Sequence, residues 1–86
     1  MNITLLPDVT LKVQADESLL LDRNGQAFYE LDSVGTLLWQ LLSVNSDFEA
    51  AFAQIVTEFE GEEEELREEL YELLEDMAEI DLVAWE

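Results

Sequence analysis

The sequence predicts an α+β fold in which three antiparallel strands precede three helices. Three observations lead to this class. Apolar and polar residues alternate near residues 9–14, an Asn-Gly pair separates two strand-like runs within residues 18–31, and helical spacing dominates from residue 33 onward. Because strands and helices occupy separate parts of the chain, α+β is favoured over a parallel α/β sheet. The length of 86 residues fits one domain, which we expect to span residues 1–86.

The first strand is expected at residues 9–14, directly after Pro7. Val9, Leu11 and Val13 alternate there with polar residues, which is the pattern of a strand with one buried face.

The second and third strands are expected at residues 18–22 and 27–31, where they form a hairpin. The Asn-Gly pair at residues 24–25 is typical of a two-residue type I′ turn. Such a turn sets a register with three facing pairs: Leu20 with Tyr29, Leu21 with Phe28, and Arg23 with Gln26. Both faces of this hairpin are more apolar than a solvent-exposed face requires.

The first two helices follow polar capping residues. Asp32 or Ser33 is expected to cap the first helix, which fades near residue 43. The second helix is expected to begin after Ser46 or Asp47, with apolar residues at amphipathic spacing. We expect the aromatic residues of these helices to belong mainly to the core: Trp39, Phe52 and Phe59.

The third helix is expected from about residue 62 to residue 80. Its apolar residues fall on one narrow stripe: Leu66, Leu70, Leu73, Met77 and Ile80. At about 100° per residue, one shoulder of the stripe holds four residues: Arg67, Tyr71, Leu74 and Ala78. Glu69 and Asp76 lie on the opposite shoulder, so the two shoulders face different environments.

Composition excludes several function classes. The chain has no cysteine and no histidine, which removes disulfides, thiolate zinc sites and Cys or His catalysis. Its 22 acidic and three basic residues give a net charge of −19, which opposes binding to nucleic acid or to an anionic membrane. No catalytic residues, cofactor or metal site are expected. The acidic run at residues 60–65 lacks calcium-loop spacing and suits the start of a helix. With no apolar run of about 20 residues, a cytoplasmic protein is expected.

The hairpin, the first helix and the third helix together resemble the PqqD-like family. The matching features in residues 20–42 are a turn glycine, an aromatic residue two before a leucine, the acidic residue after it, and a Gly and Trp four apart: Gly25, Tyr29, Leu31, Asp32, Gly35 and Trp39. Later features are Glu69-Leu70, Leu73-Leu74, Met77 and Leu82-Val83. The resemblance covers residues 18–83. Asp81 stands where the family has a glycine, and aspartate also tolerates a left-handed helix end.

The resemblance implies a small winged helix-turn-helix fold and a role in recognising ribosomally made, modified peptides. Family members bind the leader segment of a precursor, which adds a strand beside the third strand and packs on the third helix. A free-standing chain of this size is most similar to the leader-binding half of a split lasso-peptide B protein. The implied partners are therefore a precursor leader peptide and a leader peptidase, and a cyclase and a homodimer stay open.

The predicted peptide site combines the third strand with the third helix. Its backbone ladder is expected from Phe28, Tyr29, Glu30 and Leu31. The side chains expected to receive the apolar anchors of the peptide are Leu70, Tyr71, Leu74 and Ala78, with Arg67 at one end. Glu30 and the acidic residues of the third helix would attract basic residues of the peptide. From the residues alone, this shoulder of the helix suits a groove and packing against the domain's own strands equally well.

Two other functions compete with this reading. A winged-helix regulator of transcription shares the topology, but the charge of −19 opposes it. An acidic subunit that mimics nucleic acid would use the charge itself to occupy a basic partner.

Overall fold

The computed structural model describes residues 1–85, and within them it contains five strands and three helices. The strands are β1 (Ile3–Leu5), β2 (Thr10–Gln14), β3 (Glu17–Leu21), β4 (Ala27–Leu31) and β5 (Val83–Trp85). The helices are α1 (Ser33–Val44), α2 (Phe48–Glu58) and α3 (Glu63–Glu79). The α+β class with antiparallel strands and three helices is confirmed, whereas the count of three strands is wrong. The winged helix-turn-helix arrangement stays a prediction.

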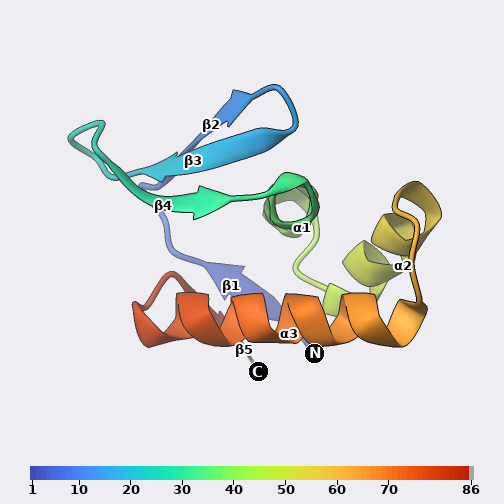
Figure 1. The fold of residues 1–86 in the computed structure, drawn as a ribbon. Helices are drawn as coiled ribbons and strands as arrows, with labels where there is room; N and C mark the ends of the chain where they lie inside the picture. Colours follow the sequence, from blue (N-terminus) through green and yellow to red (C-terminus); the bar gives the residue numbers. More distant parts are fainter. Residues whose placement is uncertain (86) are drawn as a thin grey trace.

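The two strands missing from the prediction, β1 and β5, form a sheet of their own. They pair antiparallel, with Ile3 opposite Trp85 and Leu5 opposite Val83. This pairing brings the two ends of the described chain together beside α3 (Figure 1). The backbone N–H of Ile3 also donates to Ser46 O at 2.8 Å, and the Ile3 side chain is buried. The small sheet thus contributes Ile3 and Val83 to the core beside α3.

The other sheet has the order β2-β3-β4, and its hairpin differs from the predicted one. Leu20 pairs with Tyr29 as predicted, but Leu21 pairs with Ala27, so the predicted pairing of Leu21 with Phe28 is wrong. The register shifts between Leu20 and Leu21, which leaves Phe28 as an extra residue in β4. Such a bulge bends the strand and interrupts the ladder at that point.

The turn explains part of this difference. Of residues 24 and 25, only Gly25 has a positive φ, of 80°, whereas a type I′ turn needs positive φ at both. The Gly25 N–H donates to Asp22 O, and the Asp22 N–H donates to Gln26 O, both at 2.9 Å. This is a three-residue loop that ends in a left-handed glycine. The predicted pairing of Arg23 with Gln26 is therefore also wrong.

Local polar contacts set where the helices begin. Asp32 caps α1 by accepting the Gly35 N–H at 2.8 Å, and Asp47 caps α2 by accepting the Glu49 N–H at 3.1 Å. A buried hydrogen bond of 2.7 Å joins the hydroxyl of Ser18 on β3 to that of Thr36 on α1. The hairpin is thereby fixed to the start of α1.

The core lies between the helices, the inner face of the hairpin sheet and the β1–β5 pair. Each helix contributes one buried face, and the largest fully buried side chains are Phe48, Ile3, Leu20, Leu38, Ile55, Leu70, Leu74, Met77 and Leu82. Trp39 and Phe52 are buried as predicted, and Phe59 packs against the core while half-buried. None of the helices within residues 1–85 combines the length and apolarity that crossing a bilayer requires.

Candidate functional site

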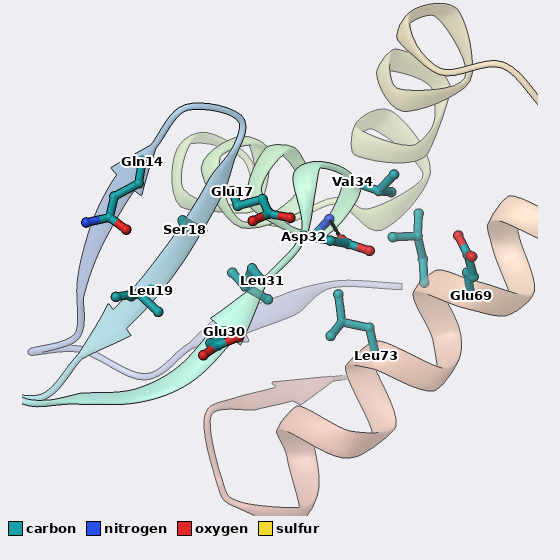
Figure 2. A pocket seen from close by; sticks show the side chains of 12 residues that line it. Gln14, Glu17, Ser18, Leu19, Glu30, Leu31, Asp32, Val34, Glu69 and Leu73 are labelled. Carbon is teal, nitrogen blue, oxygen red and sulfur yellow. Dashed lines mark hydrogen bonds between the residues drawn. The ribbon is translucent and has the colours of Figure 1, made fainter.

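A cleft of about 670 Å³ separates the end of β4 from α3. Glu30 and Leu31 of β4 line one wall, and Glu69 and Leu73 of α3 line the other (Figure 2). The start of α1 closes one end of the cleft with Asp32, Val34 and Gly35, and the end of the β2–β3 hairpin contributes Gln14, Glu17, Ser18 and Leu19. The cleft therefore lies where consecutive elements within residues 14–35 meet α3, which is far from them in sequence.

The floor of the cleft is apolar. Leu31 and Leu70 are buried, and Leu73 is half-buried beside them. Gly35 lets α1 approach this floor closely, because an added Cβ there would lie 3.1 Å from Leu73 Cδ2 and 3.2 Å from Leu31 Cδ2. These distances are shorter than ordinary van der Waals contact, so a larger residue would require these leucines to shift.

The rim of the cleft is acidic. Carboxylates lining it belong to Glu17, Glu30, Asp32 and Glu69. Asp32 already accepts the Gly35 N–H, and Figure 2 draws this bond at the start of α1. Farther along the same strand and helix, burial raises the pKa of the Tyr29 hydroxyl, and the negative charge of Asp76 raises this pKa further. Two acidic residues of α3, Glu69 and Asp76, thus lie close to β4.

The strand β4 pairs with β3 on one side only, and it is the last strand in the order β2-β3-β4. Within the described residues the other edge of β4 has no strand partner. The cleft lies at the C-terminal end of β4, where Glu30 and Leu31 line it. The bulge limits the regular part of the edge to residues 29–31. Phe28 lies at the bulge and exposes 43% of its surface.

The shoulder of α3 that carries Arg67 and Tyr71 packs against α2. Two nitrogens of the Arg67 guanidinium donate to the Glu49 carboxylate, at 2.7 and 3.1 Å, and the Arg67 guanidinium lies 4.2 Å from the centre of the Phe52 ring. The Tyr71 ring stacks on Phe48 with centroids 5.2 Å apart, and Arg67 also donates to the Tyr71 hydroxyl at 3.3 Å. The contact with α2 therefore occupies this shoulder.

The same contact determines the protonation of the pair. The hydrogen bond from Arg67 lowers the pKa of Glu49 below its ordinary value. The pKa of Arg67 is raised, first by its bond to Glu49 and then by its bond to Tyr71. Both shifts favour the charged forms, and the ion pair connects α2 to α3.

The predicted site residues separate into three groups in the structure. Those that line the cleft are Glu30, Leu31 and Leu70, and those that lie on the same edge strand are Phe28 and Tyr29. The remaining four were expected beside the third strand, and this placement is corrected: Arg67 and Tyr71 contact α2, Leu74 is fully buried, and Ala78 packs half-buried against the core. The role of all nine residues in peptide binding stays a prediction.

Sequence reasoning missed the residues that actually line the α3 wall. Glu69 lies on the shoulder opposite Arg67, which was not assigned to a neighbour, and Leu73 was assigned to the core stripe. One signal could have indicated this side of the helix. Arg67 lies on the other shoulder, and Glu49 of the preceding helix is a carboxylate with which it can pair. Within residues 1–85, no group of three or more His, Cys, Asp or Glu side chains is placed to hold a metal ion.

Fold and cleft together define a class: a small α+β domain with an open strand edge facing a helix across an apolar-floored cleft. The family model for Coenzyme PQQ synthesis protein D (PqqD) matches residues 17–83, and the chain belongs to this family. This confirms the resemblance found in the sequence.

A solved structure described as TbiB1 in complex with the TbiA(beta) leader peptide is similar to this chain. The identity is 25%, the TM-score is 0.78, and 96% of each chain is covered. The similarity therefore includes strand β2, which lies before the region that the family model matches. Among curated proteins, no relative matches the chain.

Proposed function

We propose that this protein binds the leader segment of a ribosomally made precursor peptide by adding it as a strand to the β4 edge, opposite α3. It then presents the peptide to a partner leader peptidase or modifying enzyme, with lasso-peptide biosynthesis favoured. The observation that carries the proposal is the coincidence of the open β4 edge with the cleft. The likeness to TbiB1, a protein whose structure contains a leader peptide, supports it.

The geometry suits strand addition. Backbone groups of residues 29–31 are available to an extended peptide, and hydrogen bonds to them supply affinity without regard to sequence. Side chains of the added strand would alternate between the apolar floor and the outside. A volume of about 670 Å³ lies in the ordinary range of ligand clefts and fits only a few side chains.

The proposed role involves recognition and presentation, so it requires no bond to be made or broken by this protein. The binding residues that we propose are Tyr29, Glu30 and Leu31 of β4, and Glu69, Leu70 and Leu73 of α3. Strands β2–β4 would form the wing of a winged helix-turn-helix that covers residues 1–86 as one domain. A peptidase or cyclase partner, a homodimer and a cytoplasmic location stay predictions.

A role in binding DNA gains no support from the charges. Two of the three cations are held in ion pairs within the described residues: Arg23 with Asp8 at 2.8 Å and Arg67 with Glu49 at 2.7 Å. Phosphate backbones are bound mainly through unpaired Lys and Arg side chains. We therefore carry forward only the peptide-binding function.

The test is a titration of the purified protein with the fluorescently labelled leader of a short precursor encoded in a neighbouring reading frame. Saturable binding is expected, together with slower amide hydrogen exchange at residues 29–31. A scrambled leader of identical composition is the matched control for charge. The proposal fails if the scrambled peptide binds equally well, or if the leader binds without protecting these amides.

A further inference from the structure

The alternation of side chains along β4 restricts what a peptide strand beside it can carry. Leu31 points inward, where only 3% of its surface is exposed, and Tyr29 is half-buried on the same side. Glu30 lies between them, is exposed, and pairs across the ladder with Leu19 of β3. A strand added to the free edge shares this pleat, so its residues opposite Tyr29 and Leu31 point inward and its residue opposite Glu30 points outward.

The inward positions favour apolar side chains. They meet a floor made by Leu31, Leu70 and Leu73. A charged side chain placed there would lose its water without gaining an ion pair on the floor. An apolar side chain, in contrast, adds to the burial of Leu73, which is partly exposed in the free protein.

The outward position favours a basic side chain. Directly opposed residues on one face of a sheet have Cβ atoms about 5 Å apart, so a Lys or Arg would lie beside the Glu30 carboxylate. Among the described residues, those that line the cleft include four carboxylates and no Lys or Arg that would neutralise them. A basic residue in the peptide therefore supplies the charge that the cleft lacks.

We infer that the cleft selects peptide segments in which a basic residue lies between two apolar residues, with the basic side chain paired to Glu30 and the apolar ones on the Leu31–Leu73 floor. This inference rests on the proposed function and specifies the chemistry of its ligand. The net charge of −19 attracts any cationic peptide, whereas the pleat determines where in the peptide the cation must be.

The experiment selects binders from a displayed library of random peptides of about ten residues, the upper end of ordinary strand length. The protein is used as wild type and as two variants with the same change in charge: Glu30→Lys and, as matched control, Glu72→Lys on the exposed side of α3 outside the cleft. Wild type and Glu72→Lys are expected to enrich an apolar-basic-apolar pattern. Glu30→Lys is expected to enrich an acidic residue in the middle.

A peptide selected by the wild type is then titrated against Glu30→Gln. The expected loss of affinity is about twofold to fivefold, the range of one cross-strand pair. The inference is overturned if the enriched peptides have no positional charge preference, or if both lysine variants change the pattern equally, because the long-range charge alone would then explain binding. The peptide-binding function survives either result.

An absence of any enrichment by the folded wild type also overturns the inference. The titration with a cognate leader separates this result from failure of the proposed function. If the leader binds and protects residues 29–31 from exchange, the function stands and only the ligand pattern is wrong. If the leader fails as well, the proposed function fails with it. Circular dichroism of each variant confirms that the fold is intact.

Discussion

Replacing Leu73 by alanine tests which side of α3 receives the peptide. The substitution removes three carbon groups, each contributing about 0.8 kcal/mol when buried. Because Leu73 is already largely buried in the free protein, at most about a third of this burial depends on the peptide, which corresponds to about 0.8 kcal/mol. We therefore expect leader binding by Leu73→Ala to weaken by at most about fourfold at 25 °C. Fluorescence anisotropy of a labelled leader measures this change.

The matched comparison is Tyr71→Ala on the opposite side. Tyr71 stacks on Phe48 and accepts a hydrogen bond from Arg67, so its loss is expected to lower the free energy of unfolding by more than about 1 kcal/mol. Urea unfolding followed by circular dichroism measures that loss. Leader affinity should be unchanged at temperatures where the variant is folded. Weaker binding by Tyr71→Ala than by Leu73→Ala would refute the placement of the peptide between β4 and α3.

Two further predictions concern the supports of the cleft. Ser18→Ala leaves the buried Thr36 hydroxyl with only a 3.5 Å contact to a backbone oxygen, so we expect it to lower the free energy of unfolding by about 1–3 kcal/mol. The double variant Ser18→Ala, Thr36→Val should lose less than the sum of the two single losses, and urea unfolding of all four proteins measures this. In a Tyr71→Phe background, ultraviolet titration should give Tyr29 a pKa above its ordinary value, and Asp76→Asn should lower this pKa only partly, because burial is the larger cause. Since the folded pKa is raised, the contribution of Tyr29 to stability is complete below its unfolded pKa and is lost as pH rises through the folded value. A midpoint at or below the ordinary value would contradict the burial of this hydroxyl.

The parts of the fold that the sequence predicted correctly depend on local chemistry. Asp32 and Asp47 cap their helices because each carboxylate reaches an amide only two or three residues ahead. The hairpin was predicted because a glycine can adopt the positive φ that Gly25 has. In each case the residues that decide the structure are neighbours in the sequence.

The missed strands depend on partners at the other end of the chain. β1 and β5 have three residues each and form only because residues 3–5 meet residues 83–85. A run of three residues is too short for periodicity to separate a strand from a loop. The bulge at Phe28 lies between the Leu20–Tyr29 and Leu21–Ala27 pairs, and the alternation of residues along the two strands does not indicate it.

The α3 wall of the cleft illustrates a different limit. Helical spacing correctly separated the shoulder of Arg67 from the shoulder of Glu69. It does not say which neighbour each shoulder meets, and this is decided by the position of α2, whose Glu49 and Phe52 engage Arg67. The structure therefore places Arg67 and Tyr71 against α2 rather than beside β4, and binding of a peptide at the β4 edge stays a prediction.

The few cations of the chain explain why the cleft keeps its negative charge. Arg23 and Arg67 each pair with a carboxylate that belongs to a different element or turn, so these cations serve contacts within the fold. The carboxylates around the cleft are left to repel one another. A basic peptide relieves this repulsion when it binds, whereas dissolved salt relieves it in the free protein. Raising salt from about 0.1 M to about 1 M shortens the Debye length from about 10 Å to about 3 Å, so it should stabilise the fold while weakening the binding of a basic peptide. These opposite signs distinguish binding that depends on charge from binding that depends only on apolar contacts, because the affinity of the latter would not fall with salt, whereas the lysine variants of Glu30 and Glu72 separate the cleft from the overall charge.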